Sequence, residues 1–236
     1  MDDRINIANA FLDKYKELEA VIEQVYRDKI RNNNDTSVFY LENRNDYKAY
    51  AVGLRCCREI RNTMQHLPKQ RGAFPIIPSQ EMIDFLDDII IKVKDRKKCT
   101  QVGIPFSQMY VREMSDLVTD TIETMRKKVF THVPIISGKR VIGIFDENAL
   151  FCYVADNGIV ELDGLTFTDM KDYLSLDGRE MEVFTFHSRQ TYLDELEEEF
   201  QRQFDMNKRL GVAFITEHGR PDEAVSHMLT AWDVIG

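Results

Sequence analysis

The sequence predicts an α+β chain of two modules. An all-α helical domain is expected over residues 1–93, and a duplicated β-α-β-β-α unit over residues 94–236. The first module shows apolar residues at helical spacing, whereas the second alternates strand-length apolar runs with helical patterns. The charge also divides the chain: residues 1–80 hold 13 basic and 11 acidic residues, and residues 81–236 hold 18 basic and 29 acidic. Such asymmetry indicates two modules with different partners.

Three helices are expected in the first module. Apolar side chains recur every three or four residues over 5–30, which predicts the first helix. A second helix is predicted over 46–67, with Asp46 as its cap, and Pro68 ends it. After a loop rich in proline, Ser79 is expected to cap the third helix.

The second module is predicted to be a duplication, with copies at about residues 100–158 and 176–236. The first copy is expected to contain strand 109–113, helix 116–129, strand 133–136, strand 141–145 and helix 147–155. The second copy is expected to contain strand 181–186, helix 190–208, strand 212–215, strand 225–229 and a final helix at 231–234. Identity between the copies is low, so chance recurrence of this element order stays open as the alternative.

Composition limits the function classes. The net charge of −9 disfavours a general nucleic-acid coat, which is normally basic. No secretory signal or membrane span is visible, so a cytoplasmic protein without a membrane partner is expected. The four cysteines form no CxxC pair, and no Cys/His cluster has zinc spacing, so no metal is expected. Four histidines are expected to be structural or surface residues: His132, His187, His218 and His227.

Two pairs of segments in the second module carry a family resemblance. They are residues 131–136 with 141–145, and residues 211–216 with 228–233. They resemble a tandem pair of CBS motifs, a Bateman module, over about residues 95–236. The resemblance implies two β-α-β-β-α units packed through their sheets, with an adenine nucleotide (AMP, ATP or a cyclic dinucleotide) as regulatory ligand. It implies no required cofactor.

In that family a Thr/Ser-x-x-Asp element after the last strand usually contacts the ligand. The second copy has Thr230 and Asp233 at this place. The hydroxyl is expected to contact a phosphate at a helix N-terminus, and the carboxylate to accept from ribose hydroxyls. A simple N-cap role for Thr230 remains the alternative. The first copy has Asp146, Glu147 and Ala149 instead, and carboxylates there are expected to repel a phosphate, which leaves a single nucleotide site or none.

The predicted second helix carries Arg61, Asn62 and His66 near its end. Arg61-Asn62-x-x-x-His66 resembles the Arg-x4-His motif of HEPN domains, over about residues 1–93. The resemblance implies a metal-independent ribonuclease in which His66 is the general acid or base and Arg61 stabilises charge on the phosphorane. Asn62 is expected to position either the phosphate or His66. Asn62 and His66 share a helix face, whereas Arg61 does not, so a composite site needs helix distortion or a second chain. The family typically builds the site in a homodimer.

Four basic residues surround this motif and are expected either to attract an RNA backbone or to form a solvated face: Arg55, Arg58, Lys69 and Arg71. The leading hypothesis is therefore a nucleotide-regulated endoribonuclease or toxin-like RNA effector. The alternative is a non-catalytic nucleotide-sensing regulatory protein whose helical domain mediates dimerisation or partner binding. A scaffold without either activity is the third interpretation.

Overall fold

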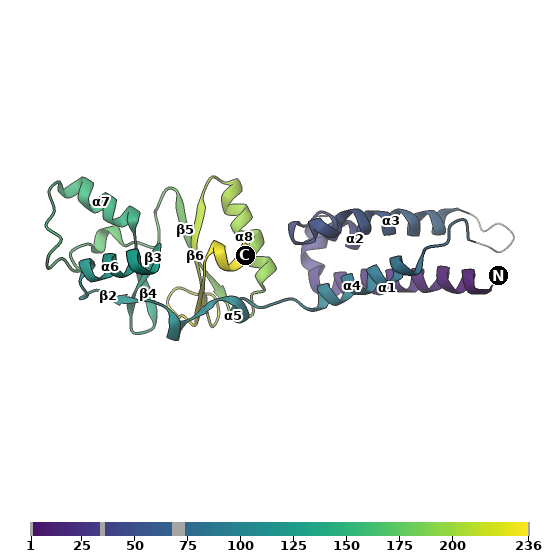
Figure 1. The fold of residues 1–236 in the computed structure, drawn as a ribbon, viewed down its shortest axis with the longest axis horizontal. Helices are drawn as coiled ribbons and strands as arrows, with labels where there is room; N and C mark the ends of the chain where they lie inside the picture. The colour runs from purple at the N-terminus through teal and green to yellow at the C-terminus, as the bar shows by residue number, and fades with distance from the viewer. Residues whose placement is uncertain (1, 34–35, 68–73, 236) are drawn as a thin grey trace. The chain divides into compact units, whose positions relative to one another are not determined.

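Helices form the described part of the first unit of the chain, Met1–Arg96 (unit 1). Two small sheets covered by helices form the second, Lys97–Gly236 (unit 2; Figure 1). The computed structural model describes residues 2–33, 36–67 and 74–235. None of its helices is long and apolar enough to span a bilayer within these residues.

Unit 1 is built from helices that bury one apolar stripe each. They are α1 (Asp2–Asn33), α2 (Ser37–Glu42), the 3-10 helix η1 (Asn45–Tyr50), α3 (Ala51–His66) and α4 (Gln80–Lys94). Helix α1 packs against α4, and α2 packs against α3. The predicted stripe of α1 is buried in their common core, and its backbone is kinked at Tyr26.

The start of the second predicted helix differs from the structure. Residues 45–50 form a 3-10 helix, and the α-helix begins only at Ala51. Asp46, which is expected to cap the helix, lies inside the 3-10 helix and five residues before Ala51. Its carboxylate accepts a 2.9 Å hydrogen bond from Nε of the buried Arg44. Helix α4 does begin directly after Ser79, although the Ser79 side chain makes no capping hydrogen bond.

Unit 2 contains the duplicated element order. The first copy is β2 (Arg112–Glu113), α6 (Val118–Lys128), β3 (His132–Ser137), β4 (Arg140–Asp146) and α7 (Glu147–Asn157). The second is β5 (Glu182–Ser188), α8 (Leu193–Asp205), β6 (Arg209–Thr216), β7 (His227–Leu229) and α9 (Ala231–Ile235). The remaining elements are α5 (Cys99–Val102), β1 (Ile104–Pro105) and the 3-10 helices η2 (Phe106–Gln108) and η3 (Lys171–Tyr173).

The two copies have the same strand topology. The sheets have the orders β2-β3-β4 and β1-β7-β6-β5. In each, the first two strands of the copy are parallel and the next pair is antiparallel. Parallel neighbours need a crossover, and α6 and α8 provide it. The order strand, helix, strand, strand, helix that is predicted for both copies is therefore repeated in the structure.

Strand β6 shows how the sheets are buried on both faces. Val212 and Phe214 lie in a core shared with Ile144 of the other sheet, so the two sheets pack against each other. Ala213 and Ile215 point to the opposite face, into a core with α8 and α9. Figure 1 shows α6 and α7 on the outer side of one sheet and α8 on the outer side of the other. Because both faces are covered, the strand is a continuous apolar run.

Candidate functional site

The end of α3 brings Arg61 and Asn62 together but leaves His66 apart. Nη1 of Arg61 donates to Oδ1 of Asn62 at 3.1 Å, and Nη2 donates to Oε1 of Glu19 at 3.3 Å. The guanidinium also lies over the ring of Tyr15, 5.4 Å from its centroid. His66 is exposed in the last turn, and no hydrogen bond joins it to either residue in the part of the chain that the structure describes. One chain alone therefore does not assemble the predicted three-residue site.

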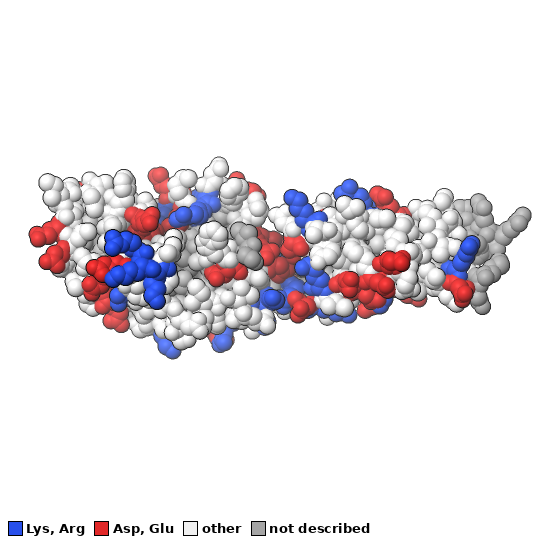
Figure 2. Space-filling view, viewed as in Figure 1, with Lys and Arg blue, Asp and Glu red and all other residues white. Residues whose placement is uncertain are grey.

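Ion pairs within the chain neutralise the arginines of α3. Glu42 has a side chain only 3% exposed and accepts from Nε of Arg55 at 2.6 Å and of Arg58 at 3.1 Å. Burial raises the pKa of Glu19, and the Arg61 charge opposes that shift. Blue and red side chains alternate over unit 1 on the face seen in Figure 2, without a continuous basic stripe. Arg55 and Arg58, expected either to attract RNA or to form a solvated face, both bind the carboxylate of Glu42. Lys69 and Arg71 lie outside the described residues.

Thr230 and Asp233 bind each other at the junction of β7 and α9. Oδ2 of Asp233 accepts from the Thr230 backbone N–H at 2.7 Å and from its hydroxyl at 2.8 Å. This is the geometry of a cap. Helix α9 has only five residues, so the helix dipole that was expected to favour a phosphate is short. Both side chains are half-buried, and Trp232 between them is 87% exposed.

The same cap occurs once more, in the segment that joins the two copies. Oδ2 of Asp169 accepts from the Thr166 backbone N–H at 2.9 Å and from its hydroxyl at 2.7 Å. These hydrogen bonds lower the pKa of Asp169. The Thr-x-x-Asp spacing is readable in the sequence at this place also, but it does not follow the last strand of a copy. The Thr-x-x-Asp motif alone therefore identifies a turn. A functional role can be argued only from its position after the last strand of a copy.

The first copy places a charged pair at the position that corresponds to Thr230. Asp146 ends β4, is 3% exposed, and its Oδ1 accepts from the Ala149 backbone N–H at 2.7 Å, which caps α7. Its other oxygen accepts a hydrogen bond from Nη1 of Arg179. The carboxylates of Asp146 and Glu147 are expected to repel a phosphate here; Asp146 is paired with Arg179, whereas Glu147 is exposed. Asp146 is neutralised and already occupied on both oxygens.

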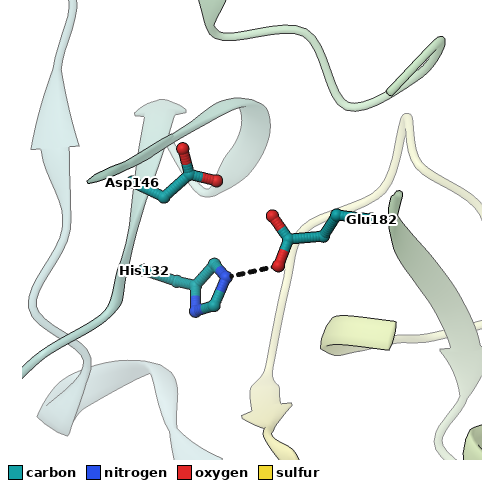
Figure 3. A group of neighbouring side chains, drawn as sticks. All are labelled: His132, Asp146 and Glu182. Carbon is teal, nitrogen blue, oxygen red and sulfur yellow. Dashed lines mark hydrogen bonds and ion pairs between the residues drawn. The ribbon is translucent and has the colours of Figure 1, made fainter. Parts of the chain in front are cut away.

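Asp146 also belongs to a cluster that the sequence did not reveal. His132, Asp146 and Glu182 approach one another with ligand-capable atoms all within 4.8 Å, and Nε2 of His132 donates to Oε1 of Glu182 at 2.9 Å (Figure 3). Burial would raise the pKa of Glu182, but hydrogen bonds from His132 and Arg209 outweigh it and lower that pKa to about 2. A separation of 50 residues between His132 and Glu182 hides this contact from any spacing argument.

Comparison with known proteins gives partial likenesses. No protein-family model matches the chain, and no curated protein matches it. A solved structure of CBSX2 in complex with AMP is 14% identical over 59% of this chain and 93% of that chain, with a TM-score of 0.41. The CBS domain of a bacterial CNNM/CorC family Mg2+ transporter in complex with ATP is 16% identical over 59% and 84%, with a TM-score of 0.40.

A third structure, CbpB in complex with c-di-AMP, is 8% identical over 61% of this chain and 86% of that chain, with a TM-score of 0.44. Several of the similar solved structures are described as CBS-domain proteins. Likenesses of this size do not assign a family to the chain.

Proposed function

We propose that this protein is a nucleotide-responsive regulatory protein whose unit 2 is a CBS pair binding one adenine nucleotide at Thr230 and Asp233. The observation that carries the proposal is the position of these residues, directly after the last strand of the second copy in a duplicated β-α-β-β-α fold. Leu229 pairs with Ala213 in antiparallel register, so Thr230 lies toward the beginning of β6. Arg209 begins β6 at the same end of the sheet, with a side chain that is 71% exposed and paired with Glu182.

The groups at this end suit the parts of a nucleotide. Oδ2 of Asp233 accepts both hydrogen bonds from Thr230, and among the described residues its Oδ1 has no partner. That oxygen can accept from a ribose hydroxyl. The Thr230 hydroxyl can turn from Asp233 to a phosphate oxygen, and the exposed Trp232 ring can cover a base.

The asymmetry of the copies favours one ligand per chain. The corresponding position in the first copy holds Asp146, whose two oxygens are bound by the α7 backbone and by Arg179. AMP, ATP and c-di-AMP, the ligands named for the three similar structures, form the natural panel for a binding test.

The ribonuclease hypothesis receives less support. Arg61, Asn62 and His66 do not converge in one chain, and Glu19 already binds Arg61. An RNA substrate and a homodimer that would complete the site therefore remain predictions, and unit 1 is assigned to partner binding or dimerisation in this proposal.

Thermal unfolding with each nucleotide tests the proposal, because a ligand that binds only the folded state raises the melting temperature. At a concentration about 100 times Kd, we expect a rise of roughly 5–10 °C for the wild type. Asp233→Ala should abolish the rise. Asp169→Ala is the matched control, since it removes the same pair of hydrogen bonds from a Thr-x-x-Asp turn outside the proposed site.

A nucleotide-dependent rise in wild type and Asp169→Ala, absent in Asp233→Ala, supports the proposal. No rise with any nucleotide, or an equal rise in both variants, contradicts it and leaves Thr230 and Asp233 as a cap.

A further inference from the structure

A cluster of charged side chains lies where the two copies of unit 2 meet. His132 begins β3 and pairs in register with Asp146 at the end of β4, so both belong to the first copy. Glu182 begins β5 and pairs in register with Arg209 at the start of β6, so both belong to the second. Arg179 precedes β5 in the segment between the copies. We call these five residues the inter-repeat charge cluster.

The contacts of the cluster run across the boundary between the copies. Oε1 of Glu182 accepts from Nε2 of His132 and from Nε of Arg209, both at 2.9 Å. Nη1 of Arg179 binds Asp146 and lies 3.6 Å from Oε2 of Glu182. Its Nη2 donates to the backbone oxygen of Ile144 at 2.9 Å. One guanidinium thus contacts a carboxylate from each copy.

These charges are removed from solvent. The side chains of Asp146, Glu182, His132 and Arg179 are 4%, 7%, 7% and 10% exposed, whereas Arg209 reaches the surface. Two carboxylates face two guanidiniums, so each carboxylate has a cationic partner. A buried charge is tolerated when it is paired, and removing one partner of a buried pair is strongly destabilising.

The donor set also resembles that of a metal site. One imidazole and two carboxylates with atoms within 4.8 Å suit a divalent ion such as Zn2+. Arg179, however, already places a positive charge against both carboxylates. A divalent ion added to the cluster as it stands would lie beside two guanidiniums that already pair with both carboxylates.

We infer that Arg179 is a tethered cation that locks the two copies together, occupying the position where this His-Asp-Glu set would otherwise hold a divalent metal ion. The lock is a conformational device, because a single side chain between the copies holds the end of β4 and the beginning of β5. Loss of the guanidinium should both loosen the junction and convert the cluster into a divalent metal site.

The experiment compares the full chain carrying Arg179→Met with the wild type. Arg189→Met is the matched control: Arg189 follows β5 at its other end, and its ion pair with Glu217 is exposed. Melting temperatures are measured in EDTA and in Zn2+, and hydrogen exchange is measured by peptide. In EDTA we expect Arg179→Met to melt about 10 °C lower and Arg189→Met within about 2 °C of the wild type.

Compared with the wild type, hydrogen exchange in Arg179→Met should be faster in peptides from β4 and β5 and unchanged in peptides from α1 and α4. Zn2+ should raise the melting temperature of Arg179→Met by about 5 °C or more, with no rise in the wild type. Stoichiometric Zn2+ binding by the wild type, lost in His132→Ala, would overturn the inference in favour of a resident metal site. Equal stability of the two arginine variants would overturn the lock.

If Arg179→Met does not fold, a triple variant that combines it with Asp146→Asn and Glu182→Gln provides the test. This triple variant leaves no buried carboxylate unpaired, so it should be more stable than Arg179→Met alone. A triple variant no more stable than the single one contradicts the inference.

Discussion

Gly143 of β4 tests how closely the segment between the copies packs on the first sheet. A Cβ at this position would lie 2.8 Å from the backbone oxygen of Leu174 and 3.0 Å from its Cβ. The neighbouring Ile144 N–H donates to that same oxygen at 2.9 Å. Leu174 is 2% exposed and belongs to the core under α6 and α7. Gly143→Ala therefore forces backbone, rather than a flexible side chain, to move.

The expected cost follows from these contacts. Overpacking a filled core costs about 1–3 kcal/mol, and weakening the hydrogen bond to Leu174 adds about 1 kcal/mol. We expect Gly143→Ala to lower the free energy of unfolding of unit 2 by about 2–4 kcal/mol. Urea denaturation of the full chain, followed by circular dichroism, measures this loss.

Gly138 in the same hairpin is the control, because it needs glycine for a different reason. Its φ is +65°, and nothing lies within 4 Å of a Cβ built there. Gly138→Ala should cost about 1–2 kcal/mol from backbone strain alone, and Gly138→Asn should restore much of it, since asparagine tolerates this conformation. The loss of unfolding free energy should be largest for Gly143→Ala, smaller for Gly138→Ala and smallest for Gly138→Asn. A Gly143→Ala protein as stable as the wild type would refute the packing described for Leu174.

Two further predictions concern charge and catalysis. The pKa of Glu182 is lowered from about 4.5 to about 2 in the folded state, so its carboxylate stabilises the fold above about pH 4.5 and loses that contribution as pH falls toward about 2. The stability difference between wild type and Glu182→Gln, measured by urea denaturation, should therefore shrink between about pH 6 and pH 3; a constant difference would contradict this. The regulatory proposal also predicts that wild type and His66→Ala leave end-labelled RNA equally intact in EDTA, whereas cleavage by the wild type alone would establish the ribonuclease.

Local patterns in the sequence located most of the elements. The run Val212–Ile215 was recognisable as a strand because both of its faces are buried, and the apolar stripe of α1 because it repeats every three or four residues. Helix α2 is not predicted from the sequence, because its six residues are too few for a helical period of apolar side chains to appear. The second α-helix begins later than predicted, because residues 45–50 form a 3-10 helix with Asp46 inside it.

The charged sites depended on contacts that no local pattern contains. Glu19 and Arg61 are 42 residues apart, and Glu42 and Arg58 are 16 apart, so the neutralisation of the α3 arginines could not be read from the motif. In the sequence, Asp146 differs from the second copy only as an aspartate at the position that corresponds to Thr230. Its pairing with Arg179, 33 residues later, appears once the copies are folded against each other.

Isothermal titration of the full chain with AMP, ATP and c-di-AMP measures directly whether unit 2 binds a nucleotide. We expect at least one nucleotide to bind the wild type with one site per chain. We also expect that Asp233→Ala loses this binding and Asp169→Ala keeps it. Two equal sites per chain, or binding that survives in Asp233→Ala, would contradict the assignment of the ligand to Thr230 and Asp233. No heat with any of the three would contradict the claim that this chain responds to these nucleotides.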